Sequence, residues 1–369
     1  MAEETLRKGT KLSGKTTYEK WQEGEGIPIV RGYFVEDLHS VPLEPWERLG
    51  GRAAFINLQG TENTNGGYVC EIAPGASLKP EAHLYEELVY ILSGHGGTVI
   101  WDRDGAKQTF EWQTGSLFSP PLNTNHQYFN GSGTEPVRFL AVTTAPLIIN
   151  LFHNLDFVFH NDFRFGDRYD GAAGYFSQTQ EPAYRNVWET NFVSDLRSFE
   201  VRGGSGRGVA VRSAHFELAS NVLGAHISEF PVGTYKKAHR HGPGANILML
   251  SGEGYSLMWP EGQQKQRVDW RPGSLFVPPD RWFHQHFNSG ATPARFVALK
   301  WGYKFSLGGS FAYEGFDLDV KEGGNQIEYE DQHPSIHETY VSECAKHGVA
   351  VRSELEQKKG EPVTKEDHV

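Results

Sequence analysis

The chain reads Gly75-Ala-Ser-Leu-Lys-Pro-Glu81-Ala-His83 and, 158 residues later, Gly233-Thr-Tyr-Lys-Lys-Ala-His239-Arg-His241. The same offset relates further glycines and a later histidine of each copy. These pairs are Gly94 with Gly252, Gly115 with Gly273, and His126 with His284. Matches at one fixed offset, without a gap, indicate that the chain contains two copies of one domain.

Short apolar runs punctuated by glycine, proline and asparagine recur through both copies. The run from Leu88 to Ser93 stops at Gly94, and the run from Ile247 to Leu250 is soon followed by Gly252. Other runs are rich in β-branched and aromatic residues, such as Thr98-Val-Ile-Trp101, and no long stretch with a 3.6-residue period interrupts them. The pattern predicts an all-β fold of two tandem jelly-roll β-barrels.

Composition restricts the classes of partner. The 369 residues carry a net charge of −11, which argues against nucleic acid. The sequence has neither an 18-residue apolar stretch nor a signal-like start, so we expect a cytoplasmic protein that spans no membrane. The only cysteines, Cys70 and Cys344, lie in different parts of the repeat, which argues against a disulfide framework.

The repeat also suggests the domain limits. We expect an N-terminal arm, a first domain, a connector, a second domain and a C-terminal extension with a short helix over 336–347, capped by Ser335. The limits are 1–30, 31–146, 147–190, 191–305 and 306–369. The aromatic connector segment 157–165 predicts packing between the barrels or across a subunit contact, and hence a homo-oligomer.

Three histidines of the second copy have the spacing of metal ligands. His239 and His241 are two residues apart on an expected strand and therefore share a face, and His284 follows 43 residues later. Three imidazoles from two strands can cover one side of a metal ion and leave other positions open. A lone core histidine is more often structural, but three at matched spacing favour a metal.

The first copy offers a different set: Glu81, His83, Glu87 and His126. Its carboxylates make it harder and more anionic, which suits Mn(II) or Fe(II). For Glu81, a solvated position at the barrel rim is an equally good interpretation, because glutamate is rarely buried without a partner.

Each copy resembles a cupin, and the whole chain a bicupin. The first cupin motif maps onto Gly75, Glu81, His83, Glu87 and Gly94, with Glu81 where the first histidine is usual. The second maps onto Gly115, Pro121, His126 and Asn130, with Asn123 in place of a glycine. In copy two the matches are Gly233, His239, His241, Gly252, Gly273, Pro279, His284 and Asn288, with Arg281 in place of the glycine.

The second copy departs from the motif where Ala245 replaces the carboxylate equivalent to Glu87. Its segments 239–245 and 278–288 are similar to gentisate 1,2-dioxygenase and related ring-cleaving Fe(II) enzymes. That resemblance implies His239, His241 and His284 as ligands and His286 as an acid or base beside them. With an ordinary pKa of about 6.5, His286 would exchange protons near neutral pH; the alternative is an orienting hydrogen-bond partner.

Several residues near these histidines are candidates for substrate binding. They are Asn246, Trp259, Arg281, Trp282 and Gln285. Aromatic rings could stack on a substrate and the polar side chains could hold a carboxylate or hydroxyl, although aromatic residues on strands are more often core.

Three functional hypotheses follow for a small-molecule substrate. The first is a non-haem Fe(II) dioxygenase acting on a small hydroxylated or aromatic carboxylate. The second is an O2-independent Mn(II) or Ni(II) lyase, isomerase or decarboxylase that uses the first copy. The third is a bicupin that binds a small molecule without catalysis.

Overall fold

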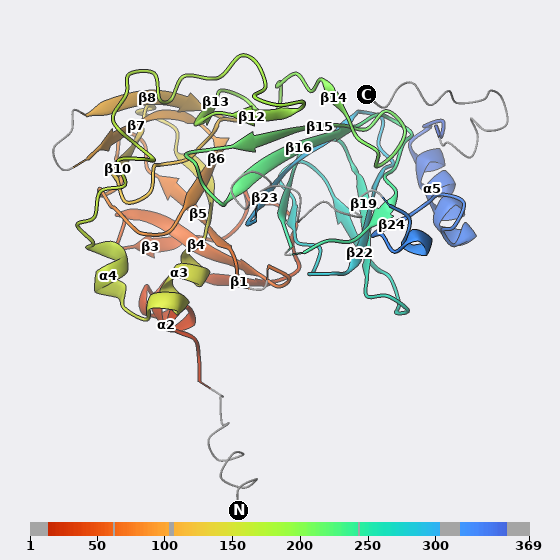
Figure 1. The fold of residues 1–369 in the computed structure, drawn as a ribbon, viewed down its shortest axis with the longest axis horizontal. Helices are drawn as coiled ribbons and strands as arrows, with labels where there is room; N and C mark the ends of the chain where they lie inside the picture. Colours follow the sequence, from red (N-terminus) through yellow and green to blue (C-terminus); the bar gives the residue numbers. More distant parts are fainter. Residues whose placement is uncertain (1–13, 62, 103–106, 243, 303–317, 353–369) are drawn as a thin grey trace, which may run out of the picture.

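The computed structural model describes residues 14–61, 63–102, 107–242, 244–302 and 318–352. Two β-barrels lie side by side, with α2 to α4 beside the first and α5 beside the second (Figure 1). No helix in these parts of the chain is long and apolar enough to span a bilayer. The predicted all-β fold of two tandem jelly-roll barrels is confirmed.

The first barrel joins a large sheet to a three-stranded sheet ordered β10-β7-β8. Its own strands are β1 (Ile29–Gly32), β3 (Glu44–Trp46), β4 (Gly51–Leu58), β5 (Gly66–Ile72), β6 (Glu87–Ser93), β7 (His95–Trp101), β8 (Gln108–Gln113), β9 (Leu117–Phe118), β10 (Asn125–Asn130) and β11 (Val137–Thr143). The large sheet runs β1-β4-β5-β11-β6-β9-β13, and β3 pairs with β4.

The second barrel repeats this plan, with a large sheet ordered β12-β15-β16-β23-β18-β21-β2 and a smaller sheet ordered β20-β19-β22-β17-β24. Its own strands are β12 (Val187–Glu189), β14 (Gly203–Gly204), β15 (Arg212–Glu217), β16 (Gly224–Phe230), β17 (Ala238–His239), β18 (Asn246–Ser251), β19 (Gly254–Trp259), β20 (Gln266–Trp270), β21 (Leu275–Phe276), β22 (Phe283–Asn288), β23 (Ala294–Lys300) and β24 (Gln326–Ile327).

The barrels exchange one short strand each. β2 (Phe34–Val35) pairs with β21 of the second barrel, and β13 (Phe192–Val193) pairs with β9 of the first. Gly115 and Gly273 make room for this exchange at positive φ, since a Cβ on either would collide with the aspartate side chain that follows the exchanged strand, Asp195 and Asp37 respectively. The exchange and an apolar core drawn from both copies join the barrels into one body.

The helices lie outside the barrels. They are α2 (Thr17–Gly24), α3 (Ala145–Phe152), α4 (Leu155–Phe159), the 3-10 turn η1 (Val320–Glu322) and α5 (Pro334–Lys346). α2 forms within the expected arm because Thr16 and Glu19 build a capping box. Its Tyr18 and Trp21 are buried in the core of the first barrel.

The helix expected over 336–347 begins earlier than predicted. α5 starts at Pro334, and its N-cap is His333, whose side chain accepts a hydrogen bond from the Ser335 backbone N–H. The predicted Ser335 cap is therefore wrong. The His333 imidazole accepts a hydrogen bond from a backbone N–H of the first turn instead. Proline suits the first helical position because it has no N–H that would need an acceptor.

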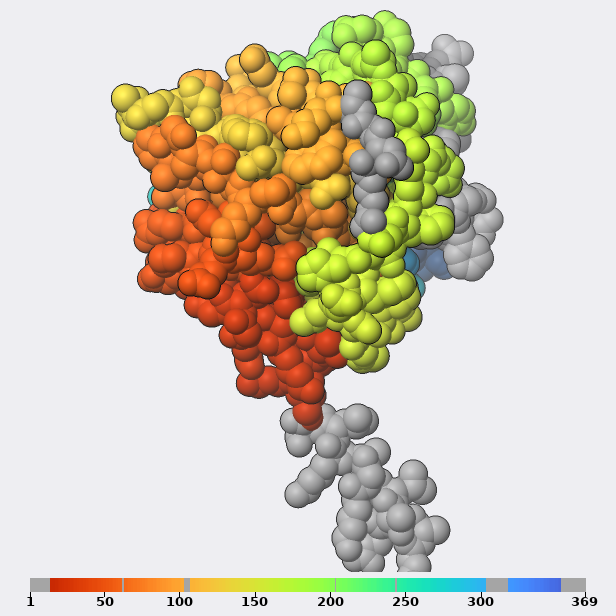
Figure 2. Space-filling view, turned by 90° about the vertical axis from the view of Figure 1, so that its left-hand side faces the viewer, coloured from red at the N-terminus to blue at the C-terminus, as the bar shows by residue number. Residues whose placement is uncertain are grey.

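The connector follows the surface of the first barrel (Figure 2). Val158 and Phe159 are buried in the core of that barrel, whereas Leu151 is 66% exposed and Phe163 63% exposed. The predicted homo-oligomer remains a prediction, and sedimentation velocity at micromolar concentration tests it: a monomer of 41.3 kDa would contradict it.

Candidate metal centres

Two strands bring the three histidines of the second barrel together. His239 on β17 lies directly opposite His284 on β22, and His241 follows two residues after His239. The His284 ring centroid lies 4.3 Å from that of His239 and 4.9 Å from that of His241. One potential ligand atom of each of the three residues lies within 4.8 Å of the others. Such a cluster has the size that a single metal ion needs.

Backbone carbonyls orient two of these imidazoles. Nδ1 of His239 donates to the Lys237 carbonyl at 2.9 Å, and Nδ1 of His284 donates to the Trp282 carbonyl at 3.2 Å. Because a carbonyl oxygen only accepts, Nδ1 must carry the proton, so the lone pair of each ring is on Nε2, the atom that would bind a metal ion.

Burial keeps the imidazoles neutral. It lowers the pKa of His239 well below the ordinary value, with a further contribution from the charge of Arg207, and it lowers the pKa of His284 to about 3. Metal ligation requires the neutral imidazole, so the site needs no deprotonation near neutral pH. An ion held by neutral ligands alone keeps its full positive charge toward a substrate.

His286 lies in the same barrel interior, next to the cluster. Its ring centroid is 5.5 Å from that of His284, and Nδ1 is 2.8 Å from Oγ of Ser256, which also accepts a hydrogen bond from Trp270 Nε1. Burial lowers the pKa of His286 well below 6.5. Burial therefore favours the neutral ring, and the expected proton exchange near neutral pH remains a prediction. Its role as a proton donor or acceptor stays a prediction.

The pleat of β22 directs Gln285 away from the histidines. His284 and His286 share one face of the strand, and Gln285 lies on the other. Its Nε2 donates to the Lys236 carbonyl at 2.9 Å and to Oε1 of Gln332 at 3.1 Å. The structure thus does not bring Gln285 to the cluster as we expected.

Of the other expected substrate contacts, Trp259 and Asn246 are engaged elsewhere, whereas the backbone of Arg281 lies next to the cluster, because its N–H donates to the His241 carbonyl at 3.1 Å. Trp259 packs in a separate apolar cluster with Phe283, 5.8 Å away between centroids. Asn246 is buried and donates to Asn65 Oδ1 at 2.6 Å. Arg281 is exposed, at a φ of 60°. Trp282, half-buried beside Tyr33, is the nearest to the cluster in sequence.

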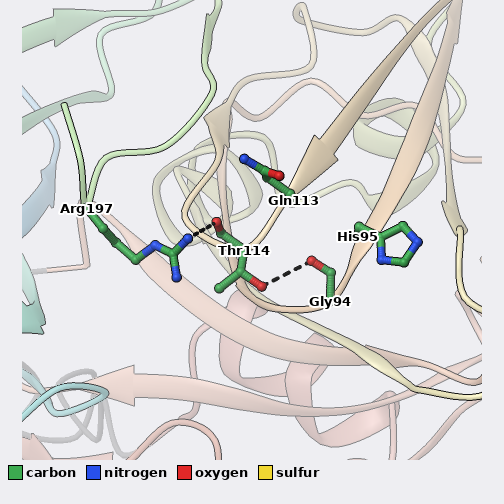
Figure 3. Close-up of a pocket in the computed structure, with 5 residues that line it drawn as sticks. All are labelled: Gly94, His95, Gln113, Thr114 and Arg197. Atoms are coloured by element: carbon green, nitrogen blue, oxygen red, sulfur yellow. Dashed lines mark hydrogen bonds between the residues drawn. The ribbon is translucent and has the colours of Figure 1, made fainter.

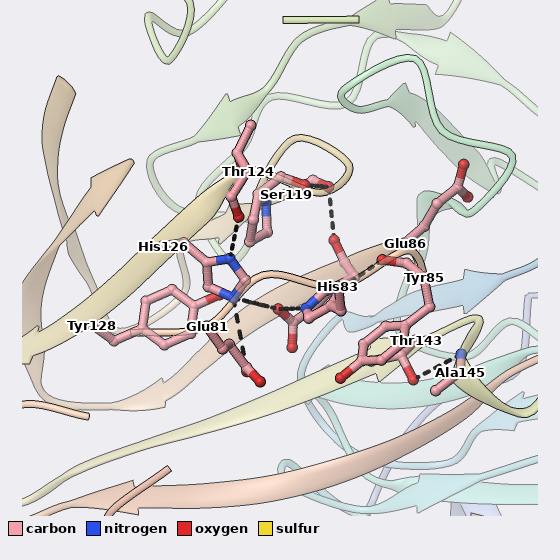
Figure 4. A network of polar contacts seen from close by, with 12 residues as sticks. Glu81, His83, Tyr85, Glu86, Ser119, Thr124, His126, Tyr128, Thr143 and Ala145 are labelled. Atoms are coloured by element: carbon pink, nitrogen blue, oxygen red, sulfur yellow. Dashed lines mark hydrogen bonds and ion pairs between the residues drawn. The ribbon is translucent and has the colours of Figure 1, made fainter. Parts of the chain in front are cut away.

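Glu81, His83 and His126 form a second cluster, in the first barrel, again with potential ligand atoms within 4.8 Å of one another. Figure 4 shows Glu81, His83 and His126 side by side. Glu87 faces the cluster, since its Oε2 is 3.7 Å from Nε2 of both His83 and His126. Carbonyls again hold Nδ1 of each ring, at 2.7 Å for His83 and 3.2 Å for His126. Both Nε2 atoms are buried without a hydrogen-bond partner, as expected of atoms that face an ion.

Charge distinguishes this cluster from the histidine cluster. Burial raises the pKa of Glu81, but His126, His83 and Arg48 outweigh it and hold that pKa at about 2. Burial likewise lowers the pKa of His126, but Glu81 and Glu87 raise it above its ordinary value. The Glu81 carboxylate is therefore charged. Its side chain is only 9% exposed, and it also forms an ion pair with Arg48 at 3.1 Å. It is not a solvated rim residue.

Two tyrosines that sequence reasoning missed hold the Glu87 carboxylate. Tyr128 donates to Oε2 at 3.1 Å, and Tyr68 donates to Oε1. Their counterparts at the repeat offset are His286 and His226. The second barrel therefore replaces an entire hydrogen-bonded unit, not Glu87 alone.

Three cations in the second barrel also escaped sequence analysis. Arg207 and Lys236 are 4% and 5% exposed, and Lys300 is half-buried. They stand where the first barrel has uncharged residues, which are Leu49, Leu78 and Thr143. The backbone pairing establishes these matches: the Lys79 N–H donates to the Leu49 carbonyl and the Lys237 N–H to the Arg207 carbonyl, each at 2.7 Å. Likewise Thr143 pairs with Gly66, and Lys300 with Gly224.

A surface hollow of about 370 Å³, drawn in Figure 3, shares no lining residue with either cluster. Its lining includes His95, Thr114 and Arg197. Arg197 is already bonded to the Thr114 carbonyl and to Asp195, at 2.8 Å each. We therefore do not assign the chemistry to this hollow.

Residues 68–143 match the family model of the cupin domain. The match lies within the first barrel, and the second barrel repeats its architecture, so the fold is that of two tandem cupin barrels. A search of curated protein sequences found no match. The resemblance of the second barrel to ring-cleaving dioxygenases stays a hypothesis.

Several solved structures are similar to this chain at low sequence identity. Oxalate decarboxylase of Bacillus subtilis is 15% identical, with a TM-score of 0.48 over 74% of this chain and 78% of that one. Oxalate decarboxylase of Lactobacillus farciminis is 13% identical, with a TM-score of 0.49 over 74% and 87%. Hazelnut (Corylus avellana) vicilin is 12% identical, with a TM-score of 0.47 over 73% and 85%. These similarities are too weak to transfer a substrate or a metal.

Proposed function

We propose that this protein is a metal-dependent oxidoreductase, a non-haem Fe(II) dioxygenase that acts on a small hydroxylated or aromatic carboxylate in its second barrel. The observation that carries the proposal is the set of three imidazoles, two buried and that of His241 partly buried, with no carboxylate in the cluster among the described residues. Neutral ligands leave the ion its full charge, and the neighbouring Arg207 and Lys236 add to the positive potential. An anionic substrate is therefore favoured there.

The side chains fit a divalent ion of this kind. Imidazole nitrogens bind Fe(II), and also Mn(II) or Ni(II), and the carbonyl bonds at Nδ1 orient two rings so that Nε2 carries the lone pair. When bound, Fe(II) would supply Lewis acidity and redox chemistry toward dioxygen.

In this proposal, His286 acts as a general acid or base. Ser256 engages its Nδ1, so Nε2 is the atom that meets a substrate. In the neutral ring, the unprotonated nitrogen has a lone pair that can accept a proton from the substrate hydroxyl.

The first barrel favours a second candidate function. Glu81, His83, Glu87 and His126 supply two carboxylates and two imidazoles, a hard donor set that suits Mn(II). Chemistry there would be that of an O2-independent lyase, isomerase or decarboxylase. Its carboxylates cancel part of the charge of an ion, so the first barrel attracts an anionic substrate less strongly.

Matched variants in the two barrels separate the candidates. His241→Ala and His83→Ala remove residues at equivalent positions of the repeat. We expect His241→Ala, and not His83→Ala, to abolish substrate-dependent O2 uptake by the iron-loaded protein over a panel of hydroxylated and aromatic carboxylates.

The reverse pattern would contradict the assignment to the second barrel. Substrate turnover under strict anaerobiosis that requires His83 would favour the lyase or isomerase. A metal content far below one ion per protein, in both the purified and the iron-loaded protein, would favour a binding protein without catalysis.

A further inference from the structure

Lys236 occupies a position inside the second barrel where the first barrel has an apolar side chain. The Lys236 N–H donates to the His286 carbonyl at 2.9 Å, as the Leu78 N–H donates to the Tyr128 carbonyl at 2.9 Å. Leu78 belongs to the apolar core of the first barrel. The lysine therefore replaces a core residue on an unchanged backbone.

The ammonium group of Lys236 lies over the ring of Phe296, which two interior histidines also contact. Its Nζ is 4.7 Å from the ring centroid of Phe296, and the rings of His286 and His226 lie 5.5 Å and 5.9 Å from the same centroid. After burial, the charge of Lys236 is among the causes that lower the pKa of His286. A chain of ring contacts thus leads from Lys236 through Phe296 and His286 to the ligand candidate His284.

Among the described residues, no carboxylate pairs with Lys236. The lysine is 5% exposed, and a buried charge without a counter-ion is costly. Burial, and then the charge of Arg207, lower its pKa to about 7. The π face of Phe296 compensates only in part. A site of this kind is stabilised when an anion enters it.

We propose that Lys236 binds a carboxylate of the substrate, and that the substrate class is a small acid with two separate acidic groups. One group faces the three histidines and their metal, and the other pairs with Lys236. The inference rests on the proposed function for the first group only, because the pairing with Lys236 needs no metal. In the first barrel, the equivalent residue is the buried Leu78, which has no charge to pair with a second carboxylate.

The experiment compares dicarboxylates with monocarboxylates of equal length. Succinate and glutarate, with butyrate and pentanoate as their partners, are titrated by calorimetry at pH 6.5 into iron-loaded protein under anaerobic conditions. We expect the dicarboxylates to bind at least about tenfold more tightly, because a charge-assisted hydrogen bond in a buried site contributes about that gain in affinity. Equal affinities for both series would overturn the inference.

Variants identify the lysine. Lys236→Met keeps the length and removes the charge, and we expect it to weaken dicarboxylate binding at least about tenfold, with monocarboxylate affinity and metal content unchanged. Lys236→Leu reproduces the residue of the first barrel and serves if the methionine variant does not fold. Lys346→Met is the control, since that lysine is exposed on α5. Unchanged dicarboxylate binding, or equal weakening of both series, would overturn the role of Lys236.

The same titrations on chelator-treated protein separate this inference from the proposed function. If the second barrel binds no metal, the proposed function fails. Dicarboxylate binding that still depends on Lys236 would then support the lysine site by itself. Binding that does not depend on Lys236 in either form of the protein overturns the inference.

Discussion

The two barrels share one backbone plan and have opposite interior charge. Where the first barrel has Glu81, the second has His239, and where the first has Glu87, the second has Ala245. Leu78 is likewise replaced by Lys236. An ion in the first barrel would be partly neutralised by carboxylates, whereas one in the second would add to cations already present.

The comparison shows that the cupin frame leaves the electrostatics of its interior free to change. In both barrels, Nδ1 bonds to carbonyls two residues away orient the histidines, at His83 and His126 as at His239 and His284. The charged side chains around them differ without altering those bonds. Ligand geometry follows from the frame, and substrate preference follows from the surrounding charge.

The largest effect is expected from the residue that replaces Tyr128. His286→Ala should lower turnover at least about a hundredfold, the scale for loss of a general acid or base, with metal content intact. Tyr128→Phe, at the equivalent position of the first barrel, should leave turnover unchanged. Loss of metal in His286→Ala would make His286 a ligand, and unchanged turnover would exclude the role.

The first barrel should depend on Glu87 for stability. Glu87→Ala leaves the buried hydroxyls of Tyr68 and Tyr128 without their acceptor, so we expect a loss of about 2–3 kcal/mol in the free energy of unfolding, measured with urea. Tyr68→Phe combined with Glu87→Ala should recover part of that loss. A change below about 0.5 kcal/mol for Glu87→Ala would show that the hydrogen-bonded unit is not structural.

A smaller effect concerns His226, the counterpart of Tyr68. Burial lowers the pKa of His226 well below 6.5, with further contributions from the charges of His215, Lys300 and Lys236. The unfolded chain therefore binds a proton below pH 6.5 that the folded chain does not, and the folded state loses stability as the pH falls.

His226→Phe should remove this part of the pH dependence. Between pH 6.5 and pH 5, the metal-free wild-type protein should lose about 1–2 kcal/mol more unfolding free energy than the variant. Urea unfolding at the two pH values measures this difference. Identical pH dependence would mean that His226 is protonated in the folded barrel, contrary to its burial.

The sequence predicted the barrels and the position of the histidines, but not their surroundings. The offset of 158 residues and the period of two along a strand are enough to place His239, His241 and His284 near one another. The exchange of β2 and β13 was not predicted, because two-residue strands carry no periodic pattern.

Two other features of the second barrel that we did not predict could have been predicted from the sequence. The rule that places His284 and His286 on one face also places Gln285 on the other. The substitution of Leu78 by Lys236 is visible at the repeat offset. That Lys236 has no carboxylate partner among the described residues follows only from the tertiary structure.

The central claim is that neutral histidines of the second barrel hold a catalytic divalent metal. Anomalous diffraction at the iron edge, from crystals of protein loaded anaerobically with Fe(II), tests it directly. We predict an iron peak within coordination distance, about 2.0–2.3 Å, of nitrogen atoms of His239, His241 and His284. Iron confined to the cluster of Glu81, His83 and His126, with none at the three histidines, would contradict the account.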